Sequence, residues 1–341
     1  MTPRLLLPTR ILDQNVGGNT TYTRALARGM AKRGWDIERI PAAGNPVATI
    51  LSESAFALRS HQSAVLHFSA DTGPMFRTRT PSAVTVHGIA SRWTSVARSR
   101  SQETVWRTRV ARAIASTDRV VTVSQSSADD VSTVFGVDRN KIAIIPHGID
   151  VDEFRAASDL SDEVAKCVPP EFALYVGNIE PRKNIFELVK AFETLDIPLV
   201  IAGRYAWNFE PAKSAIENSS NVIYLGFISN EDRRALMQRC SLFVFPSHYE
   251  GFGFPVLEAM AAGAPVLCSN RGSLAEVAGP ARRLEGLDRE AIRAGVLASL
   301  DDAAWRSGYA TEAAGWVEKF SWERSIAAHT SIYEDLLTAR R

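Results

Sequence analysis

The chain has 341 residues, of which 45% are hydrophobic and 23% charged, a composition typical of a soluble globular protein with room for two domains. Its formal net charge of +1 argues against a general nucleic-acid binder. Three scattered cysteines, without the spacing of a metal site or a disulfide framework, favour a cytoplasmic setting. No apolar run reaches the 18 residues of a membrane span, which leaves at most a peripheral contact with the inner face of a membrane.

The first half of the chain alternates short β-rich runs with helical stretches, as parallel sheets flanked by helices do. A run at 4–8 precedes a helix from about Thr20 to Arg33, and further runs follow at 36–41, 64–69, 82–88, 119–124 and 142–148. Gly17 and Gly18 lie just before that helix. Without side chains they would let the backbone approach a bound group closely, although a tight turn explains them equally well.

His87 ends the β-rich run 82–88. A single histidine at the end of a strand is more often structural than catalytic. The carboxyl edge of a parallel sheet, however, is where ligands bind, which favours a functional role for this one.

An arginine-rich segment lies at 91–119, with seven arginines against Glu103 and Asp118. A solvated helix face is one interpretation of such a segment. The other is a basic surface that meets anionic lipid or an anionic acceptor, and so a peripheral membrane contact through these residues.

The second half of the chain follows a polar linker at 155–171 and again alternates strands with helices. Its expected strands are 172–178, 197–204, 221–227, 241–247 and 264–269. The first of them ends at Gly177 and Asn178, and a short loop then brings Arg182 and Lys183 to the start of a helix. Two cations beside a helix N-terminus form a natural site for a diphosphate, although a solvated pair is the simpler interpretation.

Two glutamates, Glu250 and Glu258, are separated by a turn that contains Gly251 and Gly253. Pro255 suits the first position of a helix and Gly263 its end, so Glu250 is expected on the loop and Glu258 in the first helical turn. The backbone amides of 252–254 would point into a binding cleft. A carboxylate at a helix start is common for dipole reasons alone, so the whole arrangement carries more weight than Glu258 does.

These patterns predict an α/β protein with two Rossmann-like, doubly wound domains, residues 1–165 and 166–320, that face a central cleft. Every distinctive residue named above lies at the end of an expected strand. A ligand shared by the two domains would therefore bind between them.

With these motifs in place, the chain resembles the retaining GT-B glycosyltransferases of family 4 (glycosyltransferase group 1), which transfer a sugar from a nucleotide donor. The E-x7-E motif of that family matches Glu250 and Glu258, and its phosphate-binding PRKN loop matches 181–184. The glycine pair, the VHG at 86–88 and the last helix, seen in 320–337, also match. The resemblance covers essentially the full chain.

The resemblance implies that 1–165 bind the acceptor, that a helix at about 321–341 packs back on them, and that 166–320 bind the nucleotide sugar. Glu258 would hold the ribose hydroxyls of the donor and Glu250 would lie at the transferred sugar. The amides of Phe252, Gly253 and Phe254 would hold sugar hydroxyls and phosphate.

In the same implied site, Arg182 and Lys183 would neutralise the leaving diphosphate, and His87 would contact the sugar from the other domain. Gly17, Gly18, Gly177 and Asn178 would complete the donor-binding set; family members often carry Arg or Thr where Asn178 stands.

The expected reaction moves a hexose, with retention, to a saccharide or glycolipid acceptor in bacterial polysaccharide or glycoconjugate biosynthesis. The PRKN form resembles mannosyltransferases of the family, which puts GDP-mannose slightly ahead of UDP-linked glucosyl or N-acetylglucosaminyl donors. Neither a metal nor another cofactor is expected, because cations and helix N-termini can stabilise the leaving anion. A GT-B nucleotide-sugar epimerase and a non-catalytic sugar-nucleotide-binding subunit stay open as alternatives.

Overall fold

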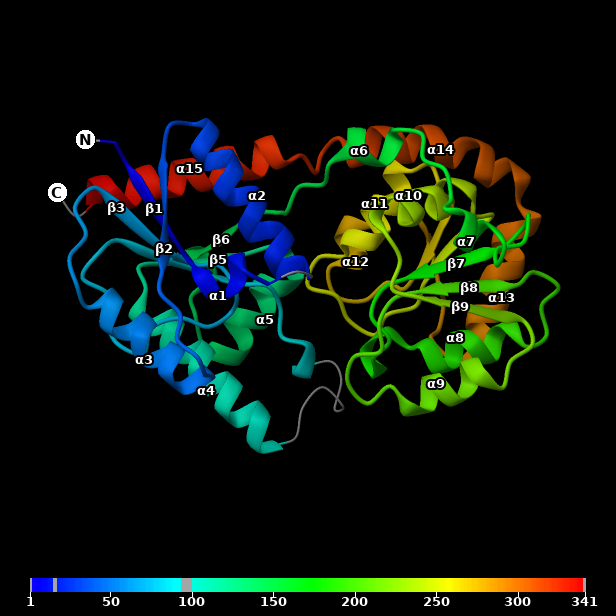
Figure 1. Ribbon diagram of the computed structural model, residues 1–341, viewed down its shortest axis with the longest axis horizontal. Coiled ribbons are helices and arrows are strands. Elements are labelled where there is room, and N and C mark those ends of the chain that lie inside the picture. The colour runs from blue at the N-terminus through cyan, green and yellow to red at the C-terminus, as the bar shows by residue number, and fades with distance from the viewer. Residues whose placement is uncertain (1, 15–16, 93–99, 340–341) are drawn as a thin grey trace. The chain divides into compact units, whose positions relative to one another are not determined.

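The computed structural model describes residues 2–14, 17–92 and 100–339 (Figure 1). The chain divides into two compact units. Unit 1 contains the described residues of 1–148 together with 320–339, and unit 2 contains 149–319. Each unit is built around its own parallel sheet.

Unit 1 has a six-stranded sheet in the order β2-β1-β3-β4-β5-β6, and all its strand pairs are parallel. Its strands are β1 (Arg4–Pro8), β2 (Asp36–Ile40), β3 (Ala64–Phe68), β4 (Ser82–Val86), β5 (Arg119–Thr122) and β6 (Ile142–Ile144). β3 and β4 are buried along their whole length, as central strands covered on both faces should be.

Helices cover both faces of this sheet (Figure 1). They are α1 (Thr9–Leu12), α2 (Gly18–Lys32), α3 (Pro46–Ala57), α4 (Arg100–Ser116), α5 (Gln125–Phe135) and α15 (Trp322–Ala339). The C-terminal helix α15 packs beside α2, where Ile326 and Tyr333 join the core around Leu5 and Leu26. The last element of the chain therefore belongs to the core of unit 1.

Unit 2 repeats the architecture, with the strand order β12-β11-β10-β7-β8-β9. Its strands are β7 (Ala173–Val176), β8 (Leu199–Ala202), β9 (Val222–Gly226), β10 (Leu242–Phe245), β11 (Val266–Cys268) and β12 (Arg282–Arg283). The helices are α6 (Val151–Arg155), α7 (Asp162–Ala165), α8 (Ile185–Phe192), α9 (Glu210–Glu217), α10 (Asn230–Arg239), α11 (Phe254–Ala261), α12 (Leu274–Val277), α13 (Arg289–Asp301) and α14 (Ala303–Val317).

The boundary between the units differs from the predicted one. It lies at residues 148 and 149, whereas the polar composition of 155–171 placed it at 165 and 166. The reason is hydrophobic: α6 packs on α11 of unit 2, and Phe154 of α6 is 3% exposed. The polar stretch also contains the short helix α7, which Ser161 caps by accepting a hydrogen bond from the backbone of Val164.

Candidate active site

In unit 2 the loops that follow β10, β7, β8 and β9 emerge in that order along one edge of the sheet. The loop after β7 begins with Gly177 and forms a short 3-10 helix, Pro181–Lys183, before α8 starts. The loop after β10 contains Glu250. The sheet thus brings together two sequence motifs that lie about 70 residues apart in the chain.

A network of ion pairs joins these two loops. Nζ of Lys183 lies 2.6 Å from Oε1 of Glu250, and Nη1 of Arg182 lies 3.0 Å from Oε2 of the same carboxylate. The other side of the Arg182 guanidinium pairs with Glu180 at 2.6 Å. We call these four residues the PRK cluster; two positive and two negative charges balance within it.

Burial and charge set the protonation of the PRK cluster. Burial alone would raise the pKa of Glu250, but the charges of Lys183 and Arg182 outweigh it and lower this pKa to about 2. Burial acts to lower the pKa of Arg182, whereas Glu250 and Glu180 raise it more strongly. Glu250 is therefore a carboxylate at neutral pH and cannot serve as a general acid.

The loop that carries Glu250 is held by its own backbone. The carbonyl of Tyr249 accepts a hydrogen bond from Arg182 at 2.9 Å, and the carbonyl of Glu250 accepts one from the amide of Ser273 at 3.0 Å. Gly253 caps α11 with a φ of 104°, and a Cβ there would lie 2.6 Å from Leu274. Only glycine fits this turn, as the sequence indicated.

α11 begins one residue before the predicted start, at Phe254, so Glu258 is its fifth residue and lies just past the first turn. Its side chain is 11% exposed and Oε2 accepts from Nη1 of Arg233, on α10, at 2.9 Å. Burial raises the pKa of Glu258, and Arg233 opposes that rise. Glu258 is thus paired with a different cation from those that hold Glu250.

Gly177 and Asn178 lie at the end of β7. The hydroxyl of Tyr175 donates to the carbonyl of Asn178 at 2.9 Å, and the side chain of Asn178 is exposed. Phe252 is 4% exposed and packs edge-to-face on Phe254, with 5.2 Å between the ring centroids.

His87 belongs to unit 1 and both of its ring nitrogens have partners there. Nε2 donates to the carbonyl of Ser69 at 2.8 Å, because a carbonyl can only accept. In the neutral ring Nδ1 is then the acceptor, and Nε2 of His147 lies 3.2 Å from it as donor. A sugar hydroxyl that binds this ring must therefore replace one of the two bonds.

Around His87 unit 1 holds a buried polar network. The ring of Tyr22, on α2, lies 5.3 Å from that of His87, and its hydroxyl bonds Nε2 of His329 at 2.7 Å. His67 on β3 bonds Thr85 at 2.7 Å and also the hydroxyl of Tyr333. Two side chains of α15, His329 and Tyr333, thus belong to this buried network through their bonds to Tyr22 and His67.

The glycine pair opens α2, the helix that carries Tyr22. Gly17 is the N-cap with a φ of 128°, and a Cβ there would meet no atom within 4 Å. Its carbonyl accepts from the amides of Thr20 and Thr21, both at 3.0 Å. Glycine is required at 17 for its backbone conformation rather than for lack of space.

Comparison with known proteins identifies the chain. Residues 39–153 match the family described as Glycosyltransferase Family 4, and residues 159–295 match Glycosyl transferases group 1. The chain belongs to the family 4 glycosyltransferases. Over 235 residues it is 32% identical to O-antigen chain mannosyltransferase B of Escherichia coli, a match that spans 63% of this chain and 60% of that relative.

Solved structures share the fold of this family 4 chain. Sucrose-phosphate synthase from Thermosynechococcus elongatus has a TM-score of 0.79 at 19% identity and covers 99% of this chain and 100% of its own. HepE of Anabaena, in complex with UDP and glucose, has a TM-score of 0.74 at 16% identity and covers 98% and 100%. The predicted α/β fold of the GT-B class is confirmed.

Three residues outside the predicted site belong to the polar contacts around it. Glu180 neutralises Arg182, Arg233 binds Glu258, and His147 contacts His87. Glu180 lies two positions before Arg182 in the same loop, and His147 ends the β-rich run 142–148 much as His87 ends its own, although the proline and glycine beside it indicate a turn. Arg233 carried no local signal, because only the tertiary fold brings α10 close to Glu258.

Within the described part of the chain, no group of three or more His, Cys, Asp or Glu side chains could hold a metal ion. No helix there is long and apolar enough to cross a membrane.

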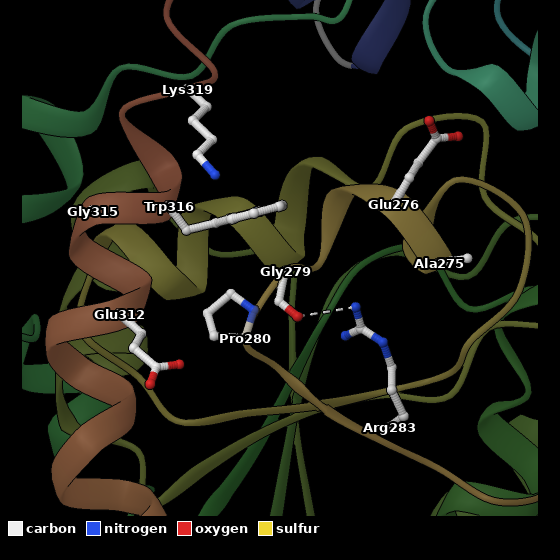
Figure 2. Close-up of a pocket in the computed structure, with 9 residues that line it drawn as sticks. All are labelled: Ala275, Glu276, Gly279, Pro280, Arg283, Glu312, Gly315, Trp316 and Lys319. Carbon is white, nitrogen blue, oxygen red and sulfur yellow. Dashed lines mark hydrogen bonds between the residues drawn. The ribbon is translucent and has the colours of Figure 1, made fainter.

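A cavity of about 550 Å³ lies elsewhere in unit 2, between α12, β12 and α14 (Figure 2). The indole nitrogen of Trp316 donates to the carbonyl of Val277 at 2.8 Å, and Nζ of Lys319 lies 3.8 Å from the ring centroid. Arg283 donates to the carbonyl of Gly279 at 3.3 Å. None of the predicted site residues lines this cavity, so it is separate from the PRK cluster.

Proposed function

We propose that this glycosyltransferase moves a hexose from a nucleotide sugar to a saccharide or glycolipid acceptor, with retention of anomeric configuration. The observation that carries the proposal is the PRK cluster, which holds a guanidinium and an ammonium ready at one sheet edge. Departure of a nucleoside diphosphate needs fixed positive charge of this kind.

Lys183 and Arg182 would act on the leaving group. An ammonium has three donors and a guanidinium five, so phosphate oxygens can bind beside or in place of Glu250. The ion pairs hold both cations in position before the donor arrives. Because those pairs are already formed, little reorganisation is needed when negative charge develops on the diphosphate.

Glu250 would accept hydrogen bonds from hydroxyls of the transferred sugar, and Glu258 would accept those of the ribose. Both side chains are buried carboxylates that the fold holds with cations, Glu250 through Lys183 and Glu258 through Arg233. A glycosidase would instead need two carboxylates that flank the scissile bond. The separate partners of the two glutamates favour transfer over hydrolysis.

In the proposed step the bond from the anomeric carbon to the diphosphate breaks, and the acceptor oxygen bonds to the same face of that carbon. The proton of the acceptor hydroxyl passes to the departing phosphate oxygen. Neither a metal nor another cofactor would be required, since hydrogen bonds from Arg182 and Lys183 would stabilise the leaving diphosphate. His87 of unit 1 would contact the sugar by exchanging its bond to Ser69 or His147.

The proposed donor is GDP-mannose, followed by UDP-linked sugars. The E. coli relative, which shares 32% identity, is by name a mannosyltransferase of O-antigen chains, which supports mannose and a role in bacterial polysaccharide biosynthesis. HepE, which shares the fold at 16% identity, was solved with UDP and glucose, and UDP-linked sugars stay the second choice of donor.

A panel of nucleotide sugars tests the reaction. With GDP-mannose and saccharide or lipid-linked acceptors we expect release of GDP, a product with retained configuration by NMR, and no loss of rate with EDTA. An epimerase would convert its donor without an acceptor, and a binding subunit would bind it without turnover. Release of nucleotide from no donor with any acceptor would show the proposal to be wrong.

Variants test the site. Lys183→Met should lower kcat strongly, on the order of 100-fold, because one donor to the leaving group is lost. Glu258→Gln should mainly raise KM for the donor. Lys213→Met, which removes an exposed lysine of α9 paired with Glu217 at 3.6 Å, is the matched control and should change neither. Normal rates in the first two variants would contradict the residue roles.

We also propose a peripheral membrane contact through the described part of 91–119; residues 93–99 lie outside the described residues. α4 exposes Val105 at 61%, and Phe76 in the same unit is exposed at 59%. Arg107 pairs with Glu103 at 2.6 Å and Arg92 with Asp130 at 2.7 Å, so the charges of these two arginines are compensated within the unit. Liposome sedimentation should show binding that rises with anionic lipid and falls with salt; salt-independent binding, or none, favours a solvated face.

A further inference from the structure

An exposed cation–aromatic pair lies at the carboxyl ends of β8 and β9 in unit 2. These strands lie on the opposite side of β7 from β10, which precedes the Glu250 loop. Arg204 follows β8 directly after Gly203, and Phe227 is the residue after the end of β9. The guanidinium carbon of Arg204 lies 3.9 Å from the centroid of the Phe227 ring. Both side chains are exposed, Phe227 at 59%, so the pair presents a cation and an aromatic ring to solvent.

This pair is connected to the PRK cluster through the backbone. The amide of Ile179 donates to the carbonyl of Arg204 at 2.8 Å, and the amide of Ala206 donates back to Ile179 at 3.0 Å. Ile179 immediately precedes Glu180, the carboxylate that pairs with Arg182. The loop after β8 is thus held beside the loop proposed to bind the diphosphate.

The strand ends between these features lack side chains. A glycine lies at the carboxyl end of each of three neighbouring strands: Gly177 follows β7, Gly203 follows β8, and Gly226 is the last residue of β9. A Cβ on Gly203 would lie 1.8 Å from the carbonyl oxygen of Gly177, so no other residue fits there. Tyr224 donates from its hydroxyl to the carbonyl of Gly203 at 2.9 Å and fixes the same backbone. At these three glycines the backbone itself therefore forms the edge between the PRK cluster and Phe227.

We infer that Arg204 and Phe227 bind the base of the donor nucleotide and that Arg204 selects guanine over uracil. This inference rests on the function proposed above. The strand order β10-β7-β8-β9 puts three strand spacings, about 15 Å in all, between the Glu250 loop and Phe227. That span is comparable with the length of an extended nucleoside diphosphate whose phosphates bind the PRK cluster.

The chemistry of the pair explains both parts of the inference. A base stacks on an aromatic ring whatever its identity, so Phe227 would contribute to binding of any nucleotide. The base would take the place of the guanidinium on this ring, and Arg204 would then lie at the edge of the base. Guanine presents two adjacent acceptors, O6 and N7, that a guanidinium fork binds with two parallel hydrogen bonds. Uracil offers no such pair, so Arg204 would favour GDP over UDP by about 10-fold or more.

Binding measurements on the full chain test this inference, with GDP and UDP as probes in isothermal titration calorimetry. The wild type should bind GDP about 10-fold more tightly than UDP. Arg204→Ala and Arg204→Lys should weaken GDP binding about 10- to 100-fold and UDP binding much less, because a lysine keeps the charge but not the fork. Phe227→Ala should weaken both about 10-fold, and Phe227→Trp should restore them.

Arg293→Ala is the control, since this exposed arginine lies on α13, which packs on α8, and among the described contacts it donates only to Thr194, in the segment that leads into the amino end of β8. It should bind GDP and UDP as the wild type does. Equal affinity of the wild type for both nucleotides, or wild-type GDP affinity in the Arg204 and Phe227 variants, overturns the inference and leaves the transferase proposal in place. If the wild type binds neither nucleotide, the proposed function fails and this inference fails with it.

Discussion

Replacing Lys183 by methionine tests the energetics of the PRK cluster independently of catalysis. The methionine keeps the volume of the aliphatic stem but removes the ammonium that lies 2.6 Å from Oε1 of Glu250. Arg182 remains on the other carboxylate oxygen at 3.0 Å. Glu250 would then be a buried carboxylate with one cationic partner in place of two.

The pKa of Glu250 gives the magnitude. Burial would raise this pKa, but Lys183 and then Arg182 lower it from the ordinary 4.5 to about 2. At 1.36 kcal/mol for each tenfold change in proton affinity, this amounts to about 3 kcal/mol of unfolding free energy at pH 7. Lys183 contributes more to this lowering than Arg182, so we expect Lys183→Met to cost up to about 2 kcal/mol at pH 7. The burial that lowers the pKa of Lys183 itself acts in the opposite direction.

The sign of the pH dependence follows from the lowered pKa. A carboxylate whose pKa is lower in the folded chain contributes its full stabilisation above pH 4.5 and loses it as the pH falls towards 2. The difference between wild type and Lys183→Met should therefore shrink from about 2 kcal/mol at pH 7 to about 1 kcal/mol at pH 3.

Urea unfolding followed by far-UV circular dichroism at pH 7, 5, 4 and 3 measures this difference. Lys213→Met is the matched control, because its partner Glu217 lies 3.6 Å away on the exposed face of α9. An exposed pair of this kind is worth about 0.5 kcal/mol or less. A cost for Lys183→Met that is the same at pH 3 as at pH 7 would refute the assignment of the low pKa of Glu250 to this ion pair.

Two further predictions concern the sheet edges of the two units. Gly203→Ala should destabilise unit 2 by about 2 kcal/mol or more, because its Cβ would lie 1.8 Å from the carbonyl oxygen of Gly177. Gly226→Ala, with a φ of 70° but no atom within 4 Å, should cost only about 1 kcal/mol; equal melting temperatures would contradict this. In unit 1, burial lowers the pKa of His329 from 6.5 to about 4. Above pH 6.5 this ring is neutral in both the folded and the unfolded chain. Below pH 6.5 the unfolded chain takes up a proton first, so the free energy of unfolding falls by about 3 kcal/mol as the pH approaches 4. His329→Gln should remove that part of the slope in urea titrations at pH 7, 5.5 and 4.5, and an unchanged slope would show that His329 does not titrate on unfolding.

The elements of the fold follow from local sequence. β-rich runs such as 64–69 and 82–88 became the buried strands β3 and β4 because β-branched and other apolar residues fill both faces of a covered sheet. The turn between Glu250 and Glu258 also followed, since glycines exclude a helix and Pro255 suits its start. The domain boundary did not follow, because composition at 155–171 does not reveal that α6 packs on α11.

The partners of the site residues could not be read from the sequence in the same way. Arg182 and Lys183 were expected as cations available to a diphosphate, but spacing along the chain does not say which carboxylate a cation will meet. Glu250 reaches them only because β10 lies next to β7 in the sheet. The contact of Arg233 with Glu258 likewise joins α10 and α11, two helices whose proximity at this point the spacing along the chain does not reveal.

The charge balance of the PRK cluster bears on how a nucleotide sugar would be recognised. Two cations and two carboxylates sum to zero, so the cluster has little long-range attraction for an anion. A diphosphate would instead gain short hydrogen bonds to donors that Glu250 and Glu180 already hold in place. In the proposed site Glu250 would have two tasks, since it would accept hydrogen bonds from the sugar and would also keep Lys183 charged and oriented. The E-x7-E motif would then supply one carboxylate that holds two cations and a second, paired with Arg233, that would accept hydrogen bonds from the ribose.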